Sequence, residues 1–454
     1  CAERAKTFRT IYPMASFQTP LMDLDGKIAD YDTAILEMIQ SFLGHSGPTT
    51  SLELANYFIL PIAHIEQALL RLEASGLVLR GHFRNQHDGI EWCERRLLAR
   101  IHHVTICQLR KAIEPVTAAQ FMRWLLKWQH VTPGTQLTGQ QGLLELIKQL
   151  QGFELPANRW ERHIFAKRIK YYDPSLLDFL CLTGAVGWGR LTSHPATRPE
   201  SVSKNRRIMP TSATPITFFV REISDWMKTS EANHLAGLSS IAKTIYQFLH
   251  DRGASFFVDI VRNVGHLKSE VESGLWELVA AGKISADSFD NLRALIDPKR
   301  RLRKRRGRHN PLQISGGRWS ILSLDNQLNH DQWLEALCFQ LLRRYGIVFR
   351  DLIAREKMLP RWRELLITFR RLEDRGEIRG GRFVSGFLGE QFALPYAVES
   401  LRAVKKEPPN DELIAVYPED PLNLIGIILP GARVVMSTKK KILLQNGVQI
   451  EAPL

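Results

Sequence analysis

The sequence predicts a mainly helical α+β fold, in which tandem winged-helix modules are followed by a small β-barrel-like domain. The main observation is the pattern Leu-x-x-x-Gly-x-(Val/Ile), which occurs four times at intervals of about a hundred residues. In each copy the leucine is the last core-facing residue of a helix, the glycine ends the helix in the left-handed conformation, and the Val or Ile opens a strand. A helix, a glycine stop and a β-hairpin in this order are typical of the end of a winged helix. The copies begin at Leu72, Leu180, Leu278 and Leu372.

The first and last copies are the most alike. Residues 71–76 read RLEASG and residues 371–376 read RLEDRG. Apolar residues recur at the helical period before each copy, over residues 62–72 and 362–372, which predicts the third helix of each module. A shorter helix and a proline precede each of them, so both modules are expected to be complete. The corresponding wings are predicted at residues 81–89 and 380–389.

The other segments complete the predicted domain organisation. The second copy is weaker because only a short helix precedes its glycine, and the third has three predicted helices. After the last wing the composition turns to Val, Ile, Leu, Pro and Gly, which predicts short strands at residues 424–429 and 441–444. The predicted domains are winged helix 1 (1–92), a helical connector (93–155), a winged-helix-like module 2 (156–235), winged helix 3 (236–298), a basic linker with a Gly-Arg-Trp-Ser segment (299–329), winged helix 4 (330–395) and the small β domain (396–454).

The charge of the chain indicates a polyanionic partner. The net charge is +14 and the pI is about 9.6, and clustered Lys and Arg gain from releasing the counterions of phosphates. Residues 299–308 contain eight Lys or Arg and no acid. Such a run cannot form a core, so we expect a mobile linker that contacts phosphates without sequence preference. A nuclear-targeting signal has the same composition, and charge does not choose between DNA and RNA.

Particular basic residues occupy the positions that contact nucleic acid in a winged helix. The exposed face of the third helix enters a groove, and the wing contacts phosphates. Arginine on a solvated helix face is also common, and winged helices can serve as protein-protein spacers. The candidates are Arg71, Arg80 and Arg84 of the first module, Arg95, Arg96 and Arg100 of the amphipathic helix after its wing, Lys299, Arg300, Arg301, Arg303, Lys304, Arg305, Arg306 and Arg308 of the basic run, and Arg370, Arg371, Arg379 and Arg382 of the last module, with Arg363 and Arg375 beside them.

Several classes of protein are disfavoured. The five cysteines include no C-x-x-C pair, so neither a zinc ribbon nor a disulfide framework is expected, and a reducing cytosol fits best. No apolar stretch approaches the roughly 20 residues that span a bilayer. No G-x-x-x-x-G-K-(S/T) motif is present, so we expect no ATPase activity, and His102-His103 is not a metal motif. We expect no cofactor and no metal in this chain.

Specific stretches of the chain resemble the large helicase-related (Lhr) proteins over nearly its whole length. The resemblance implies a bacterial superfamily 2 DNA helicase used in DNA repair, whose two motor domains precede this region and bind ATP and magnesium. The implied partners are DNA, those amino-terminal helicase domains and other copies of the chain, with a cytoplasmic, nucleoid-associated location. Because the chain starts at Cys1, we expect a fragment of a longer protein. The stretches are Glu91–His102, Trp128–Thr135, Tyr172–Pro174 with Leu177-Asp178, Gly317–Ser320, Gly381–Val384, Gly389–Pro395 and Asp420–Gly431.

The resemblance also leaves two alternatives to a DNA-gripping region of a repair helicase. The family's carboxy-terminal region is similar in build to bacterial winged-helix DNA glycosylases, which implies that the chain could release uracil or a damaged base. A glycosylase needs a carboxylate or a polarised water beside the flipped nucleotide. The candidates are Glu390 and Gln391 after the last wing and Asp420 in a turn before a strand, where an Asx-type turn is the alternative. A pure oligomerisation scaffold is the other alternative.

Overall fold

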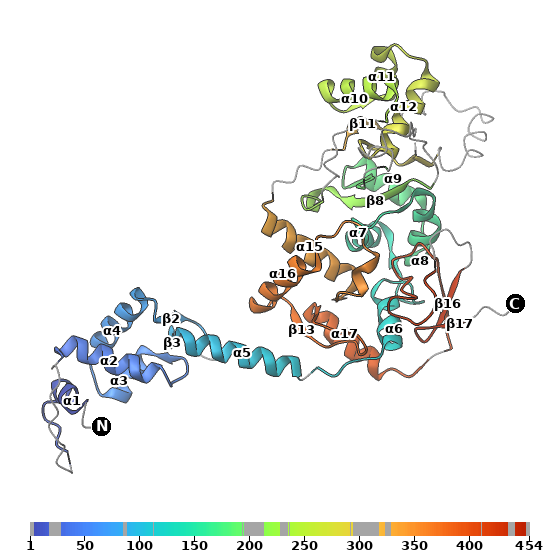
Figure 1. Cartoon of the computed structure of the whole chain (residues 1–454). Coiled ribbons are helices and arrows are strands. Elements are labelled where there is room, and N and C mark those ends of the chain that lie inside the picture. Colours follow the sequence, from blue (N-terminus) through green and yellow to red (C-terminus); the bar gives the residue numbers. More distant parts are fainter. Residues whose placement is uncertain are drawn as a thin grey trace. The chain divides into compact units, whose positions relative to one another are not determined.

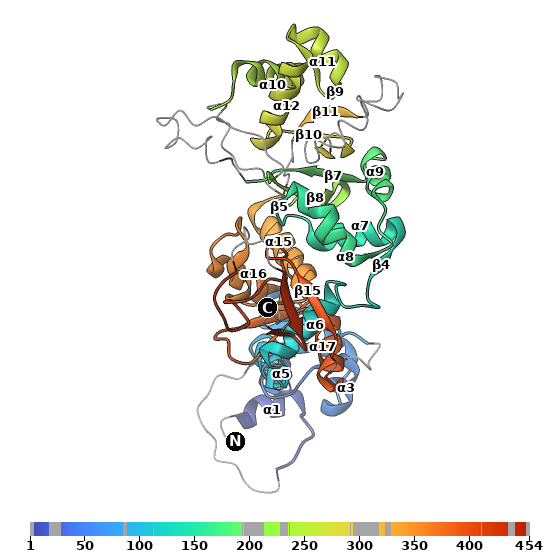
Figure 2. The same ribbon diagram turned by 90° about the vertical axis from the view of Figure 1, so that its right-hand side faces the viewer.

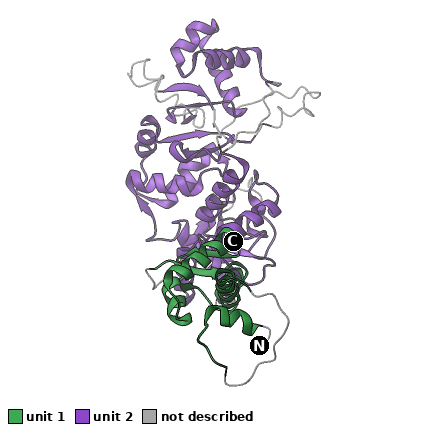
Figure 3. Cartoon of the chain, turned by 90° about the vertical axis from the view of Figure 1, so that its left-hand side faces the viewer, with its two compact units in different colours: residues 1–112 green, residues 113–454 purple. Residues whose placement is uncertain are grey.

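The computed structural model describes residues 4–17, 29–84, 89–111, 113–192, 194, 213–227, 235, 237–290, 292–293, 317–322, 328–409, 411–434 and 441–450. The chain divides into two compact units, residues 1–112 and 113–454, and each is described by itself (Figure 3). No helix of the described ranges is long and apolar enough to cross a membrane.

Unit 1 contains a short first helix, one winged helix and a long last helix. Its elements are α1 (Ala5–Ile11), α2 (Tyr31–Leu43), β1 (Thr49–Thr50), α3 (Ser51–Phe58), α4 (Ile62–Ala74), β2 (Val78–Gly81), β3 (Glu91–Glu94) and α5 (Arg95–Lys111). Thr50 and Glu53 form a capping box, which lets the chain pass directly from β1 into α3. The core lies between α2 and α4, where Ile35, Ile39 and Leu69 are buried. We name residues 31–94 module 1.

Unit 2 contains three further modules of the same kind (Figures 1 and 2). Module 2 consists of α7 (Gly139–Leu150), β5 (Leu155–Pro156), η2 (Ala157–Arg159), the π-helix η3 (Trp160–Phe165), α8 (Ala166–Arg168), α9 (Pro174–Leu182), β7 (Val186–Gly189) and β8 (Pro215–Val220). Module 3 consists of α10 (Ser240–Arg252), β9 (Ser255–Phe256), α11 (Phe257–Val264), α12 (Lys268–Ala280), β10 (Ile284–Ala286) and β11 (Arg318–Ile321). Module 4 consists of α15 (His330–Tyr345), β12 (Ile347–Val348), η8 (Leu352–Arg355), α16 (Trp362–Asp374), β13 (Arg379–Gly381) and β14 (Gln391–Ala393).

The four modules share one sheet topology. Each has a three-stranded antiparallel sheet in which the last strand lies between the first two, in the orders β1-β3-β2, β5-β8-β7, β9-β11-β10 and β12-β14-β13. In every case the first strand has only two residues and is the last element before the second helical segment, which follows at once in modules 1 to 3 and after three residues in module 4. This arrangement is that of a winged helix, so the described strands bear out the predicted winged-helix architecture.

The predicted glycine stop is confirmed at all four copies of the pattern. Gly76, Gly184, Gly282 and Gly376 have φ between 71° and 79°. In three copies the residue after the glycine donates its backbone N–H to the carbonyl of the pattern's leucine, as from Leu77 to Leu72 at 3.0 Å. The equivalent bonds in modules 3 and 4 are 2.9 and 3.1 Å long. The same Schellman geometry therefore ends the third helix of each of these modules.

The boundaries of modules 2 and 3 differ from the predicted ranges. Helix α7, inside the predicted connector, is the first helix of module 2. The segment Gly317–Ser320 overlaps β11, the third strand of the sheet of module 3, and does not belong to a linker between modules. The basic run at residues 299–308 therefore falls within the β10–β11 connection, and the run itself lies outside the described residues. The prediction assumed a short wing, but the charge of the run excludes only a core and not a long wing.

The predicted small β-barrel is wrong. The last strands, β15 (Leu413–Val416), β16 (Ile442–Gln445) and β17 (Val448–Ile450), form an open antiparallel sheet in the order β15-β16-β17, and no closed sheet occurs among the described residues. The predicted strand at residues 424–429 is mostly turn, with one bridge between Ile425 and Leu429. Its apolar side chains fill the core next to module 4, which explains their strand-like composition without a strand.

Two large cores hold unit 2 together. One joins module 4 to α6 (Ala118–Trp128), α17 (Pro395–Lys406) and the last sheet. The other is shared by modules 2 and 3, where Phe218 of β8 contacts Phe289 after β10 at 4.9 Å between ring centroids. The remaining described elements are β4 (Leu137–Thr138), which pairs in parallel with β6 (Ile169–Lys170), and η6 (Arg221–Ile223).

Candidate nucleic-acid interface

Helix α16 presents a basic outer face. Its inner face buries Leu365, Phe369 and Leu372 completely in the core of module 4. On the opposite side of the helix, Arg363 and Arg370 are exposed. They lie four residues before and three residues after Ile367, on the same face, and the side chain of Ile367 is 44% exposed. A helix with a fully packed inner face and an arginine-bearing outer face can enter a groove of nucleic acid without disturbing the core.

Some arginines of module 4 pair with carboxylates on its own surface. The Nε of Arg370 lies 2.7 Å from Glu390 in the wing, and the guanidinium of Arg375 contacts both carboxylate oxygens of Glu335 at 2.8 and 2.9 Å. Arg371 lies 3.4 Å from Asp331. Exposed pairs of this kind contribute only about 0–1 kcal/mol. Pairing therefore does not prevent Arg370 from exchanging a carboxylate for a phosphate.

Three other arginines of module 4 are available without breaking a pair. Arg363, Arg379 and Arg382 are exposed, and no carboxylate pairs with them among the residues that the structure describes. They come from the start of α16, the strand β13 and the wing. These are the three parts of a winged helix that meet the groove and the backbone of nucleic acid.

Module 1 has a less basic surface at the same positions. Arg71 is exposed on α4, but Arg80 pairs with Glu73 at 2.9 Å and Arg84 pairs with both Glu91 and Glu53. The exposed face of α4 also carries Ala63, Glu66, Gln67 and Leu70.

The long helix α5 has one basic and one apolar side, as predicted. Arg95, Arg96 and Arg100 belong to its basic side and are all exposed, while Val104 and Leu109 are 46% and 47% exposed. No other described element of unit 1 therefore buries the apolar side of α5.

The third helices of modules 2 and 3 do not resemble α16. Most of α12 is buried, including Leu275, Trp276 and Val279, so this helix is part of the core. The exposed side of α9 carries Phe179 and Leu182, which are 50% and 62% exposed. Among the described third helices, α16 is thus the one with the most basic exposed face.

The predicted catalytic residues Glu390 and Gln391 lie at the base of the wing of module 4. Gln391 is fully buried: its Oε1 accepts hydrogen bonds from the backbone N–H groups of Phe383 and Val384 at 2.9 and 2.8 Å, and its Nε2 donates to the carbonyl of Val384. Glu91 of module 1 accepts from the backbone N–H groups of Phe83 and Arg84 in the same way. The side chain of Gln391 thus closes the wing, and its catalytic role stays a prediction.

The third catalytic candidate, Asp420, lies in another network. Its carboxylate receives two hydrogen bonds from the buried guanidinium of Arg168, at 2.8 and 2.9 Å, and one from the backbone N–H of Leu422 at 3.0 Å. The last bond is the Asx-type turn that the sequence offered as the alternative. Glu390, Gln391 and Asp420 are therefore not brought together by any hydrogen bond or ion pair among the described residues, and a catalytic role for Asp420 stays a prediction.

Glu419, which the sequence interpretation missed, forms a buried pair beside Asp420. Its carboxylate lies 2.7 Å from Nδ1 of His163 and 3.1 Å from Nε of Arg159, and the ring of His163 stacks on Tyr417 at 3.5 Å. Burial lowers the pKa of His163, against the opposing effect of the hydrogen bond to Glu419. The run Glu419-Asp420 was visible in the sequence, but its partners are about 250 residues away.

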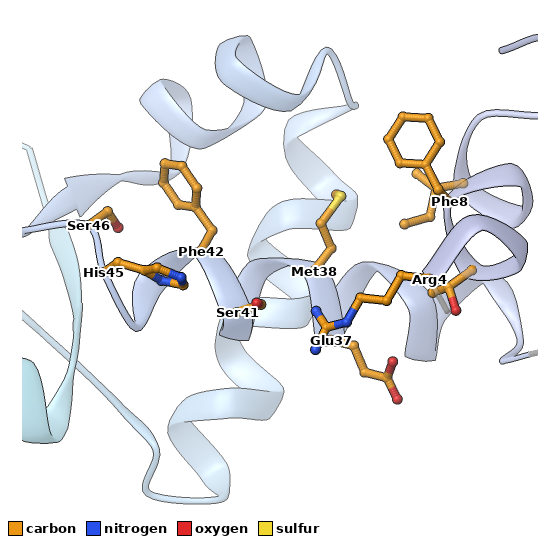
Figure 4. A pocket seen from close by; sticks show the side chains of 10 residues that line it. Arg4, Phe8, Glu37, Met38, Ser41, Phe42, His45 and Ser46 are labelled. Carbon is orange, nitrogen blue, oxygen red and sulfur yellow. The ribbon is translucent and has the colours of Figure 1, made fainter. Parts of the chain in front are cut away.

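In unit 1 a groove of about 480 Å³ lies between α1 and α2, lined by Phe8, Met38 and Phe42 with Arg4 and Glu37 at one end (Figure 4).

A second cavity of about 210 Å³ lies between modules 2 and 4.

No group of His, Cys, Asp and Glu side chains suited to a metal ion occurs in the described part of the chain.

Two family models match the chain. Residues 116–206 and 327–413 each match a winged-helix domain of the large helicase-related protein. The chain is 27% identical over 423 residues to the Lhr helicase/probable uracil glycosylase of Mycolicibacterium smegmatis and 29% identical over 423 residues to the Lhr helicase/uracil glycosylase of Escherichia coli. These alignments cover 87% and 84% of this chain and 26% of each relative, so the chain spans about a quarter of the length of the curated relatives.

Among solved structures, the DNA glycosylase AlkZ of Streptomyces sahachiroi aligns with a TM-score of 0.41 and 10% sequence identity, over 74% of this chain and 87% of that one. The family models match modules that the fold already shows to be winged helices, and the relatives match most of the chain. Residues 116–206 and 327–413 therefore match winged-helix domains of the large helicase-related protein, and most of the chain is similar to the two Lhr relatives.

Proposed function

We propose that this chain is a DNA-binding region of a repair helicase and that module 4 makes the main contact. The observation that carries the proposal is the set of exposed arginines on α16 and its wing, of which Arg363, Arg379 and Arg382 have no carboxylate partner among the described residues. Both curated relatives are named helicases, and a helicase needs surfaces that hold DNA while its motor moves. The motor domains, with ATP and magnesium, are proposed to belong to the rest of the protein.

The basic run adds a second proposed contact. Because residues 299–308 are part of the β10–β11 connection, they would contact phosphates from the wing of module 3. Neutralising the run should flatten the salt dependence of DNA binding, by about 0.9 in the slope of log K against log salt for each phosphate that the chain no longer neutralises. An unchanged slope would show that the run does not contact phosphate.

The main proposal is tested with three neutral substitutions in module 4. A chain with Arg363→Gln, Arg379→Gln and Arg382→Gln should bind a duplex oligonucleotide more weakly, with a salt slope lower by about 3, because each arginine is expected to contact one phosphate. Fluorescence anisotropy at several salt concentrations measures both quantities.

The matched control removes the same charge from the first two helices of module 3, with Lys243→Gln, Arg252→Gln and Arg262→Gln. All three side chains are exposed and lie away from α16 in the sequence and the sheet topology. The control should bind nearly as the parent does. Equal decreases in the two variants would mean that total charge, and not module 4, determines the affinity.

Release of a base is the second candidate function, and the names of both relatives favour it because each includes uracil glycosylase. Incubating the chain with uracil-containing and undamaged oligonucleotides, without ATP, and scoring abasic sites tests it. Glu390→Gln is the informative variant, because Glu390 contacts Arg370 at the surface and its replacement spares the buried wing. Base release unchanged by this variant would remove Glu390 from the site.

A further inference from the structure

The cavity between modules 2 and 4 has aromatic walls from both modules. Phe153 of module 2, Trp226 in the segment after η6 and Trp333 of α15 line it, and Phe153 is 4% exposed while the two indoles are partly exposed. Trp226 packs directly over Gly152, where an added Cβ would lie 2.6 Å from the indole ring. Flat aromatic surfaces of this kind favour a planar ring that can stack on them. Any nucleobase meets this requirement, because every base has a flat π-face.

The same cavity contains a buried hydrogen-bond donor without an acceptor. The side chain of Arg344 is 2% exposed and stacks over Phe153 at 5.4 Å. One of its terminal nitrogens pairs with Glu356 and the other donates to the carbonyl of Gln151 at 2.6 Å, but its Nε has no partner among the described residues. Buried polar groups are nearly always satisfied. An acceptor such as a ring carbonyl, held in the cavity, would satisfy this N–H.

The cavity borders the helix that carries the proposed DNA contact. Residues 356–359 line it, and α16 begins three residues later at Trp362. Lys357 and Met358 of this segment are exposed. Arg363, at the start of α16, is therefore close along the protein chain to the rim of the cavity. A DNA strand held by Arg363 would pass near that rim.

From these observations we propose that the cavity binds a single unpaired nucleobase, extruded from the DNA that module 4 holds. The ring lies against the aromatic walls, and a carbonyl of the base accepts from Nε of Arg344. This inference rests on the proposed function of module 4, and it is independent of whether the chain cleaves the glycosidic bond. A fully paired base cannot reach the site without leaving the stack.

Three duplexes of one sequence test the inference with the full chain. The first has a pyrrolocytosine, a fluorescent base with a ring carbonyl, paired with guanine; the second has the same base as a single-nucleotide bulge; the third has a bulge at that position without a base. The chain should bind the second duplex roughly 5- to 100-fold more tightly than the third, the range that one base–aromatic stack provides. The fluorescence of the bulged base should change on binding.

Two variants place the effect in the cavity. Trp333→Leu and Trp226→Leu, made separately, should each reduce the preference for the bulged base and leave binding to the paired duplex unchanged. Trp128→Leu is the matched control, since this indole is also partly buried in unit 2 but packs on Tyr396 outside the cavity. Thermal unfolding of each variant checks that the fold is kept.

The outcomes separate the two proposals. The variant with Arg363, Arg379 and Arg382 replaced tests only the proposed DNA contact of module 4. Its binding to the paired duplex says nothing about the cavity. A parent chain that binds the two bulged duplexes equally overturns the inference about the cavity, whatever the variants do. A preference that persists in both tryptophan variants places the base elsewhere and also overturns it.

Discussion

Modules 1 and 4 have the same backbone plan but differ in their exposed side chains. Helix α4 runs from Ile62 to Ala74 and α16 from Trp362 to Asp374, so each position in one has its counterpart 300 residues later. The buried positions of both helices carry mainly apolar side chains. At two exposed positions, however, Ala63 and Leu70 of module 1 correspond to Arg363 and Arg370 of module 4. Because exposed positions hardly affect packing, one fold can be a DNA-binding module in one copy and not in another.

The closure of the two wings differs in the same way. Gln391 both accepts from two backbone N–H groups and donates to a carbonyl, so its own closing contacts in the wing of module 4 involve no charged group. Glu91 can only accept hydrogen bonds when it is ionised, and it also holds the guanidinium of Arg84. The basic residues of wing 4 therefore remain available for a ligand, whereas Arg84 of wing 1 is used by the fold.

The largest expected effect comes from removing the wing closures. Gln391→Ala should lower the free energy of unfolding around wing 4 by about 2–4 kcal/mol, because it leaves two buried N–H groups and a carbonyl without partners. Glu91→Ala should lower the free energy of unfolding by less, since Arg84 keeps its contact with Glu53 and the side chain of Arg84 is partly exposed. Hydrogen exchange of the two wing segments during urea unfolding reports each separately. Equal decreases would contradict the difference between the closures.

Exchanging the outer faces of the two helices should change DNA affinity in opposite directions. Arg363→Ala with Arg370→Leu should weaken duplex binding roughly tenfold and lower the salt slope by about 2. Ala63→Arg with Leu70→Arg should strengthen binding by a smaller factor. Anisotropy titrations at several salt concentrations measure both. If the module 1 substitutions fully restore the affinity of the module 4 variant, the two modules are equivalent DNA-binding surfaces.

Acid should weaken the closure that Glu91 makes in the wing of module 1 and should spare the closure that Gln391 makes in the wing of module 4. Burial of Glu91 opposes its ionisation, but the hydrogen bonds from Arg84 and from two backbone N–H groups lower its pKa below the ordinary value of 4.5. Its contribution to stability is therefore present above that value and is lost as the pH falls through the lowered pKa. Gln391 does not titrate. Protection factors of wing 1 should fall below about pH 4.5 relative to wing 4, and Glu91→Gln should remove most of the difference.

The smallest expected effect concerns the turn between the second and third helices. Ile59 of module 1 ends α3 at φ 53° and is 87% exposed, while Gly265 ends α11 of module 3 at φ 72°. A β-branched residue is strained in the left-handed region. Ile59→Gly should therefore stabilise unit 1 by about 0.5–1 kcal/mol, measured by the same hydrogen-exchange experiment. Ile59→Val keeps the strain and should give no gain.

Local patterns predicted much of the fold. The glycine stops and the apolar period before them are local signals, and they correctly placed α4, α16 and the strands that follow. At the offset of 300 residues that aligns residues 71–76 with 371–376, Gln391 corresponds to Glu91, so the wing-closing role of Gln391 could have been found from the sequence. The implied similarity to winged-helix DNA glycosylases instead suggested catalysis.

The features that depend on distant residues could not be predicted. The connection from β10 to β11 spans residues 287–317, and no local pattern indicates that the two strands pair. The partners of Glu419 and Asp420 lie in module 2, so the sequence shows two acids in a turn but not the cations that hold them. The cavity requires side chains from two modules and has no motif of its own.

The shared core of modules 2 and 3 changes what kind of repeat protein this is. Arg293, after β10, pairs with Glu161 and Asp178 of module 2, and an added Cβ at Gly282 would lie 2.8 Å from the carbonyl oxygen of Arg190. Neither copy could be deleted, or multiplied, without exposing the apolar surface of the other. This pair has thus lost the independence of a duplicated domain: it should unfold in one cooperative step, and evolution can alter its number of copies only by two at a time.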